Sequence, residues 1–600
     1  MLKKRFAVVK EWNHTVSAED ECLQRIKHAA LEVGYSCEFV DQEYRRIEVD
    51  SSQIADEKNF DFVIHIHFCS SKINNLFSFV ALWNPEEFYH SWGYRQYSDN
   101  LMTHDDFLTC GSVGADSHLR RLLVGDFFHK APRFELYHSL QAPKLVPERR
   151  TDRRFHYCGM NWEKLTSKKG RHDDLLRWLD SNDLIDIYGP EKFQGVRPWE
   201  GFKCYRGEIP FDGHSMIQSI SNSGIALVLS SEAHIRAGMM SNRLFEAMAA
   251  GVPIVCDKNP KAREIVGDNA FYVDTNDFAS IERIFKYLNS HPDEAYQKAC
   301  RCQEIWMEKY RMSDFLKKIY SEFEIRKSEL DDLHRCEGTI TAIFVLGYSL
   351  EEAENNYSSV FDQIKSNLRA KDKAVLIVPS NFKRKTIDIE SSYEYVEENI
   401  CINGERCLGP AIAKILENIK TDYFSIVMPN ERVLKNHFSS LTKTLDNSSA
   451  EVAASDYVLR VQTHIGINYQ AKQTRNLPAI NYLSGAYLFR RELISQTNLD
   501  FIKALDSSLV LLFLLGPIKL VETRKFSLVL DHFDLKNLKD IERLYDLRAS
   551  DTLKVLNVDR HLIPSGSDSG IIRRLRNHFI YLRKYPRLWR ILRIIGRNFA

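Results

Sequence analysis

The stretch Ser241-Asn242-Arg243-Leu244-Phe245-Glu246-Ala247-Met248-Ala249-Ala250-Gly251-Val252-Pro253-Ile254-Val255 decides how this chain is interpreted. Ser241 is a residue type that begins helices, and apolar residues then fill one side of the following turns. Gly251 suits a helix end and Pro253 prevents the helix from continuing, which predicts a short helix followed by a buried strand. Glu246 lies in the middle of this apolar helix, where burying a charge without a partner is costly. We therefore expect Glu246 to serve a ligand.

Size and composition indicate an ordinary globular protein of about three or four domains. The chain has 600 residues, 44% of them hydrophobic and 27% charged, and a formal net charge of +1, which implies no general attraction to nucleic acid. Its 12 cysteines include no Cys-x-x-Cys pair, so we expect reduced cysteines in a cytosolic compartment, without a zinc site. No signal peptide is predicted, and the most apolar run, Leu509 to Leu515, is too short to span a bilayer.

Residues 1–150 are predicted to form a parallel α/β sheet, because strand-like runs alternate with helical patterns. Ligands of such sheets bind at the carboxyl ends of strands, which selects the predicted loops at 84–90 and 111–116. In the first loop, Glu86 and His90 are candidates for a base or for acceptor contacts. His65 and His67 are predicted to face one way on a strand, where polar contacts are favoured over a metal. The predicted strands are 6–9, 37–40, 62–67, 79–83 and 107–110.

Residues 151–330 repeat the alternation of strands and helices. A strand at 155–160 leads into a basic loop with Lys169 and Arg171, and a helix is predicted to begin at Asp173. A basic loop before a helix N-terminus is a natural anion site. The near-continuously apolar run at 224–230 is typical of a buried parallel strand, and it precedes the stretch that opens this section.

The order of these elements resembles the donor-binding domain of GT-B glycosyltransferases. The resemblance is carried by the stretch at 241–255, by Arg263-Glu264-Ile265-Val266 and by Phe271-Tyr272-Val273. It covers residues 151–330 well, and it covers residues 1–150 as the expected partner, a Rossmann-like acceptor domain. It implies a nucleotide-sugar donor and no metal cofactor for this half of the chain.

The resemblance also implies roles for individual residues. Glu246 would bind the ribose hydroxyls as a double acceptor. Ser241, Asn242 and Arg243 would face the diphosphate at the helix N-terminus, with Lys169 and Arg171 as further charge in place of a metal. Glu232 and His234, in the loop before the helix, are the catalytic candidates, although Glu232 lies further from Glu246 than in the commonest pattern. The alternative is that the helix only packs and Glu246 is solvated.

Strand-like runs at 339–345, 374–378 and 423–428 are followed by a segment at 483–492. This order, over residues 338–535, resembles a GT-A glycosyltransferase domain. In that family a strand like Tyr423–Met428 is followed by an Asp-x-Asp type motif that binds Mg²⁺ or Mn²⁺. This chain has Pro429-Asn430-Glu431 instead, so Glu431 remains as the firm metal ligand. Asp506 stands where the family keeps its catalytic base. We expect a degenerate or structural domain in preference to an active one.

Residues 536–600 are predicted to form a helical, basic and amphipathic tail. Between Ile571 and Ala600 there are nine Lys or Arg residues, no Asp or Glu, and apolar residues at helical spacing. This pattern favours binding to an anionic membrane surface. Nucleic-acid binding, which the apolar stripe argues against, and packing on the other domains are the alternatives.

These features together predict an α/β protein with two Rossmann-like domains, a GT-A-like domain and a basic tail. We expect it to move a sugar, such as a hexose, from a nucleotide-sugar donor to a glycan or lipid-linked acceptor in surface polysaccharide synthesis. It would work in the cytoplasm, peripherally on the inner face of the cell membrane. The alternatives are a nucleotide-sugar epimerase of the same fold and a non-catalytic membrane-bound scaffold.

Overall fold

The structure is a computed structural model that divides into two units, residues 1–533 and 534–600. It describes residues 4–13, 16–49, 52–123, 132, 134–137, 142–165, 167, 169–379, 382, 395–399, 408–463, 466–472, 484–496, 499, 502 and 520–530. The predicted tail at 536–600 and the predicted base Asp506 therefore lie outside the described residues. None of the helices within the described ranges is long and apolar enough to cross a bilayer.

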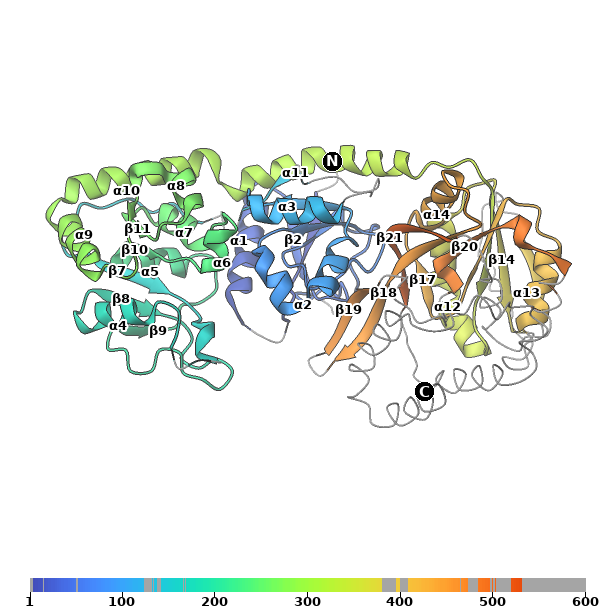
Figure 1. Cartoon of the computed structure of the whole chain (residues 1–600), viewed down its shortest axis with the longest axis horizontal. Coiled ribbons are helices and arrows are strands. Elements are labelled where there is room, and N and C mark those ends of the chain that lie inside the picture. The colour runs from blue at the N-terminus through green and yellow to red at the C-terminus, as the bar shows by residue number, and fades with distance from the viewer. Residues whose placement is uncertain are drawn as a thin grey trace, which may run out of the picture. The chain divides into compact units, whose positions relative to one another are not determined.

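The first sheet has six parallel strands in the order β2-β1-β3-β4-β5-β6 (Figure 1). Its strand order reverses between β1 and β3, which is where ligands of open α/β sheets bind. Helix α1 begins with a capping box, in which Ser17 and Asp20 each accept from the backbone N–H of the other. The elements are β1 (Arg5–Val9), α1 (Ala18–Glu32), β2 (Ser36–Val40), β3 (Phe62–His65), β4 (Phe77–Ala81), α2 (Glu86–Leu101), β5 (Asp106–Thr109), α3 (Val113–Leu122) and β6 (Phe134–Glu135).

The second sheet is also parallel, in the order β12-β11-β10-β7-β8-β9. Its strand order reverses between β7 and β10, so the carboxyl ends of these two strands form a second ligand edge. The elements are β7 (Arg154–Cys158), η1 (Trp162–Leu165), α4 (Asp173–Ser181), β8 (Ile185–Tyr188), β9 (Tyr205–Gly207), α5 (Ser215–Ser223), β10 (Gly224–Val228), α6 (Glu232–Arg236), α7 (Asn242–Ala250), β11 (Ile254–Cys256), α8 (Pro260–Val266), η2 (Gly267–Asn269), β12 (Phe271–Tyr272), α9 (Phe278–Ser290), α10 (Pro292–Lys309) and α11 (Met312–Leu333).

Helix α11 returns the chain from the second sheet to the first. The ring of Phe323 lies 5.3 Å from that of Phe62 in β3 and 5.0 Å from that of Phe77 in β4. Further along the helix, the fully buried Arg326 pairs with Asp106 at 3.4 Å. The two sheets are therefore joined by the covalent chain twice, once before β7 and once at the start of α11.

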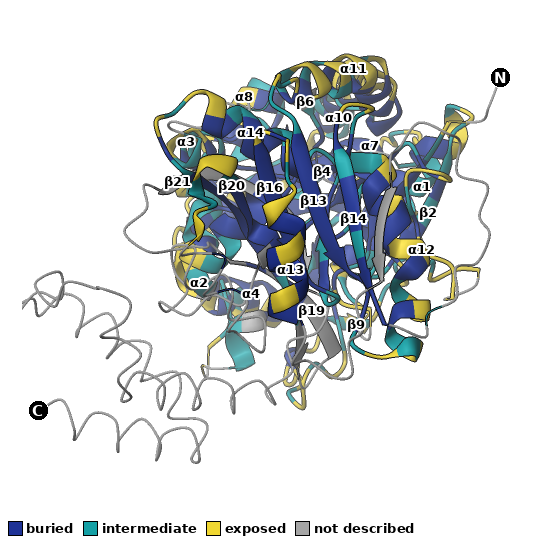
Figure 2. Cartoon of the chain, turned by 90° about the vertical axis from the view of Figure 1, so that its right-hand side faces the viewer, coloured by how far each residue is buried: buried dark blue, intermediate teal, exposed yellow. Residues whose placement is uncertain are grey.

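The third sheet is mixed and contains nine strands within the residues that the structure describes. Its main path is β15-β14-β13-β16-β20-β18-β21-β17, and β19 pairs with β18. Figure 2 shows that β13 is buried along its length and that α13 has one buried and one exposed side. The elements are β13 (Ile340–Val345), α12 (Leu350–Asn367), β14 (Lys373–Val378), β15 (Tyr395–Asn399), α13 (Leu408–Glu417), β16 (Tyr423–Val427), β17 (Glu431–Val433), α14 (His437–Asp446), β18 (Val452–Thr463), β19 (Gly466–Lys472), η5 (Ser484–Ala486), β20 (Tyr487–Arg490), η6 (Arg491–Leu493) and β21 (Leu520–Leu530).

The predicted alternation of strands and helices is confirmed in each of the first two sheets, but both predicted loops are wrong. The segment at 111–116 opens helix α3, which begins at Val113 after its N-cap Ser112. The segment at 84–90 opens helix α2, so Glu86 and His90 lie in its first turns. Pro85 stands at the N-cap position, where its fixed φ suits a helix start and its missing N–H is not needed. The predicted strand at 62–67 is shorter than expected, because β3 ends at His65.

Removing the ring that fixes α11 to the first sheet should destabilise the protein. Phe323 is 2% exposed, so Phe323→Ala leaves a cavity and should cost about 3–5 kcal/mol. The midpoint of urea unfolding, followed by circular dichroism, measures the effect. The matched control is Ile325→Ala on the same helix. Because Ile325 is 51% exposed, its loss should change the free energy of unfolding by less than about 0.5 kcal/mol. Equal midpoints for the two variants would contradict this packing.

Candidate functional site

A cavity of about 480 Å³ lies at the carboxyl ends of β7 and β8, beside the start of α7. The segments that follow β8 and β9 form another wall, and the first turns of α1 close the side toward the first sheet. Gly189 follows β8 with φ +154°, and a Cβ there would lie 2.3 Å from the Gly159 carbonyl oxygen, so this wall requires glycine. The cavity therefore occupies the ligand edge that the strand order of the second sheet predicts.

Helix α7 begins and ends where the sequence predicts. Gly251 adopts the left-handed conformation with φ +67°, as expected for a glycine after a helix. Ser241 occupies the N-cap position, but its side chain makes no capping hydrogen bond, which corrects the expectation of an ordinary cap. Its Oγ is buried and has no hydrogen-bond partner among the described residues. A buried hydroxyl of this kind at a helix N-terminus can donate to an anionic ligand.

Glu246 is 3% exposed and lines the cavity, so the alternative of a solvated side chain is wrong. Its Oε1 accepts hydrogen bonds from Arg25 Nη1 at 3.0 Å and from Asn242 Nδ2 at 3.1 Å. Within the described part of the chain, Oε2 accepts none. The site thus fixes one oxygen of the carboxylate and leaves the other to a donor that enters the cavity.

Arg25 extends from α1 and joins Glu246 to a second carboxylate. The arginine is fully buried and pairs with Glu21 one turn earlier, whose Oε2 accepts the Gly213 N–H of the second sheet's loop at 2.9 Å. Burial disfavours the charged guanidinium, but the pKa of Arg25 is nevertheless raised because Glu246 and Glu21 stabilise it. For Glu246, burial disfavours the charged carboxylate and raises its pKa. Two carboxyl groups share one cation, so this wall has spare acceptor capacity.

Arg243, about one turn before Glu246 on α7, brings positive charge to the cavity. Its Nε donates to the Cys158 carbonyl at 3.0 Å, and its guanidinium lies 5.7 Å from the centre of the Tyr157 ring. A Cβ at Gly159 would lie 3.4 Å from Arg243 Nη2, so the arginine runs close along the backbone after β7. The start of α7 and Arg243 together present N–H donors and positive charge to the cavity.

Lys169 and Arg171 make ion pairs elsewhere. Lys169 Nζ lies 2.9 Å from Asp174 Oδ1 on the exposed surface, and this hydrogen bond raises the pKa of the lysine. Arg171 Nε donates to Glu163 Oε1 at 2.7 Å. Neither side chain is among the described residues that line the cavity. Their contribution to anion binding stays a prediction.

Glu232 and His234 lie on α6, a short helix within the predicted loop. Glu232 is exposed and pairs with Arg236 at 3.0 Å, and Arg236 also binds Glu87 of the first sheet's α2. His234 Nδ1 lies 2.6 Å from Ser231 Oγ, and its ring is 6.1 Å from that of Phe88. These two residues face the start of α2 rather than Glu246, and their catalytic role stays a prediction.

Acidic and aromatic residues that the sequence interpretation missed gather at the ligand edge of the first sheet. Glu11 and Trp12 follow β1, and their backbone N–H groups donate to the carboxylate of Glu19 in the first turn of α1 at 2.6 and 3.2 Å. The Trp12 ring lies 4.5 Å from that of His67, with an angle of 52° between their planes. The available signal was the position of Glu11 and Trp12 directly after a buried strand. By contrast, His65 is buried and bonded to Tyr44 and Ser70, a structural role.

Glu431 is a buried residue whose carboxylate binds backbone amides. Its Oε2 accepts from Met428 N at 2.8 Å and from Gly485 N at 2.9 Å, which holds β16, β17 and η5 together. The described ranges contain no group of three His, Cys, Asp or Glu residues that could hold a metal ion. The Mg²⁺ or Mn²⁺ site at Glu431 stays a prediction, since Asp506 lies outside the described residues.

Replacing Arg25 should destabilise the contact between the first two sheets. Arg25→Met leaves Glu21 and Glu246 buried without their cation, which should cost about 3–5 kcal/mol. The urea midpoint measures the loss. The control Arg301→Met removes an exposed pair with Glu304 and should change the free energy of unfolding by less than about 1 kcal/mol. A loss of stability for Arg25→Met within that smaller range would show that the buried triad contributes little.

Glu11 should make stability depend on pH. Burial raises its pKa from 4.5 to about 8, so between these values the folded protein holds a proton that the unfolded chain releases. Stability should therefore fall as pH rises through this window. Glu11→Gln should match the parent protein in thermal midpoint at about pH 5 and exceed it at about pH 8.5. Glu200→Gln, at an exposed position, should have the thermal midpoint of the parent protein at both pH values. If Glu11→Gln also matches the parent at both pH values, the raised pKa of Glu11 is refuted.

Comparison with known proteins agrees with this geometry in one part of the chain. Residues 144–320 match the family model described as glycosyl transferase-like. No curated protein sequence matches the chain.

Three solved structures illustrate the structural similarities. Sucrose-phosphate synthase from Thermosynechococcus elongatus is 8% identical over 55% of this chain and 100% of that one, with a TM-score of 0.36. The Anabaena protein HepE in complex with UDP and glucose is 12% identical over 54% and 100%, with a TM-score of 0.36. A glycosyltransferase from Rickettsia africae is 11% identical over 55% and 99%, with a TM-score of 0.34. The family match thus covers the segment that contains the second parallel α/β sheet and most of the residues that line the cavity beside α7.

Proposed function

We propose that this chain transfers a sugar from a nucleotide-sugar donor, bound in the cavity beside α7, to a hydroxyl group of a glycan or lipid-linked acceptor. The observation that carries the proposal is the carboxylate of Glu246, with Oε1 held by Arg25 and Asn242 and Oε2 left to the cavity. A ribose diol supplies the hydroxyl donors that such an acceptor lacks.

The diphosphate of the donor would lie between Arg243 and the first turn of α7. Transfer forms a bond between the acceptor oxygen and the anomeric carbon, and it breaks the bond from that carbon to the diphosphate, which leaves as an anion. Arg243, the backbone N–H groups at the start of α7 and the Ser241 hydroxyl would stabilise the charge on the leaving group. No metal is needed for this stabilisation.

The acceptor would approach from the ligand edge of the first sheet. Trp12, beside His67, offers an aromatic face for a sugar ring, and Glu19 lies two residues before the cavity-lining Glu21 on α1. The proton released by the acceptor hydroxyl would pass to the departing diphosphate or to a carboxylate at this edge. Glu232 and His234 remain the alternative candidates on the second sheet's side.

The wider setting is surface polysaccharide synthesis on the cytoplasmic face of the membrane. The basic tail at 536–600 would hold the protein at anionic lipid, and the third sheet would serve as a degenerate GT-A-like domain that docks the acceptor. The resemblance of residues 338–535 and the charge of the tail support this part of the proposal.

The donor site is tested by titrating nucleotide-sugars into the purified full chain in a calorimeter, with and without EDTA. We expect at least one donor to bind equally well in EDTA. Glu246→Gln should weaken that binding about 10-fold to 100-fold, because a buried hydrogen bond to a charged acceptor is lost. The matched control is Glu232→Gln, which changes an exposed carboxylate outside the cavity and should leave donor affinity unchanged.

Three results would overturn this assignment. Unchanged affinity in Glu246→Gln would remove the ribose role, and loss of binding in EDTA would remove the metal-free site. Conversion of the donor sugar without any acceptor, detected by mass spectrometry and chromatography, would instead favour an epimerase.

A further inference from the structure

A second cavity, of about 350 Å³, lies where the chain passes between the first two sheets. The chain leaves the first sheet through residues 142–150 and returns at the start of α11. Both passages contribute to the walls, and Gln303 Nε2 ties them together by donating to the Leu145 carbonyl at 2.6 Å. The side chains that matter for the argument are His28, Glu32, Lys144, His214, Trp306 and Arg311.

The charges that line this hinge cavity are mainly basic. Lys144 and Arg311 are cations, whereas Glu32, paired with Arg311, is the acidic side chain among the lining residues. Arg311 Nε is buried and has no hydrogen-bond partner within the described residues. Trp306, 1% exposed, forms an apolar wall. Buried guanidinium donors without partners bind anions well, because each unmade hydrogen bond costs free energy.

Two histidines also line the hinge cavity. The rings of His28 from α1 and His214 from the loop before α5 stack at 4.5 Å with an angle of 17° between their planes. Burial lowers the pKa of His28, and His214 and Arg25 lower it further, while Glu21 and Asp212 act in the opposite direction. An anion between Lys144, Arg311 and this pair would favour the protonated ring of His28.

We propose that the hinge cavity binds a small anion that carries one or two phosphate groups. The volume suits a small ligand, and the cations come from both chain passages, so the anion would contact both. The site is separate from the donor cavity, and its existence does not depend on the proposed transferase activity. A bound anion would hold the two passages in one arrangement and so restrict movement of the second sheet against the first.

The test titrates inorganic pyrophosphate into the purified full chain by calorimetry at about pH 6.5. We expect binding that is weakened about 10-fold or more in Lys144→Gln and in His214→Gln, which alter exposed side chains and should not disturb folding. Lys286→Gln, at an exposed side chain outside both cavities, is the matched control and should retain this binding. Hydrogen exchange should show that pyrophosphate protects residues 142–145 and 306–312.

The source of the anion and the role of the histidines are tested separately. Sulfate, whose charge is constant between about pH 6 and about pH 8, should bind more tightly at the lower pH, and His28→Gln should reduce this dependence. A nucleoside diphosphate that binds as tightly as pyrophosphate, and loses that binding in Lys144→Gln, would assign the site to a nucleotide instead of a free phosphate compound. Absence of pyrophosphate binding, or binding lost in Arg243→Gln and retained in Lys144→Gln, would overturn the proposal.

Discussion

The buried triad of Glu21, Arg25 and Glu246 is the interaction on which the candidate site depends. Arg25 is inaccessible to solvent, so its charge is compensated by the two carboxylates and not by water. Glu21 lies on α1, beside the first sheet, and Glu246 lies on α7, beside the second. Arg25 and Glu246 are 221 residues apart along the chain. The geometry of the donor wall is thus set by the first sheet, although the donor cavity is formed mainly by the second.

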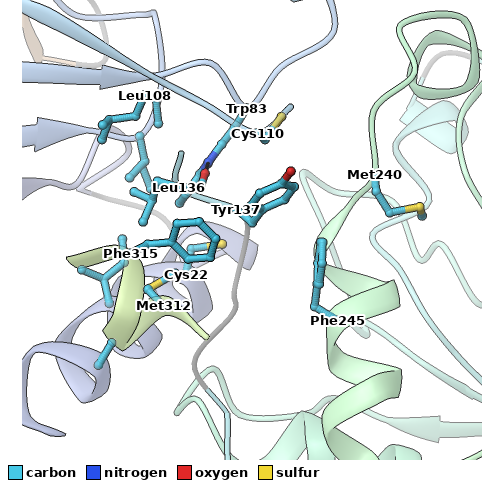
Figure 3. Close-up of a cluster of buried hydrophobic side chains, with 14 of the residues drawn as sticks. Cys22, Trp83, Leu108, Cys110, Leu136, Tyr137, Met240, Phe245, Met312 and Phe315 are labelled. Carbon is cyan, nitrogen blue, oxygen red and sulfur yellow. Dashed lines mark hydrogen bonds between the residues drawn. The ribbon is translucent and has the colours of Figure 1, made fainter. Parts of the chain in front are cut away.

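An aromatic cluster beside the triad fixes the same interface without charge. Tyr137, directly after β6, lies between Phe315 of α11 and Phe245 of α7, with ring centres 5.7 Å away in both cases (Figure 3). Phe245 directly precedes Glu246 on α7. The aromatic packing of Phe245 and the ion pair of Glu246 together hold this helix in register with the first sheet. Because apolar packing tolerates small shifts better than a buried ion pair, the triad is the more specific of the two contacts.

The sequence predicted the elements of this site better than its contacts. Local signals were enough for α7, because Gly251 and Pro253 act through backbone conformation alone. They could not reveal that Arg25 would reach Glu246, since that pairing depends on how two sheets meet. Helix α2 was missed for a similar reason: its glycine, Gly93 with φ 140°, and its mixed polar face weaken the helical pattern, which packing on the sheet then overrides.

Helix α1 shows how one surface can serve two cavities. Glu21, Arg25, His28 and Glu32 recur at spacings of four, three and four residues, which places them along one face of the helix. Glu21 lines the donor cavity at one end of this polar face, and His28 and Glu32 line the hinge cavity at the other. A helix is stiff over this length, so a ligand that displaces one end must displace the other or break the triad between them. The polar face of α1 therefore links the donor wall to the hinge through rigid structure, with no intermediate loop required.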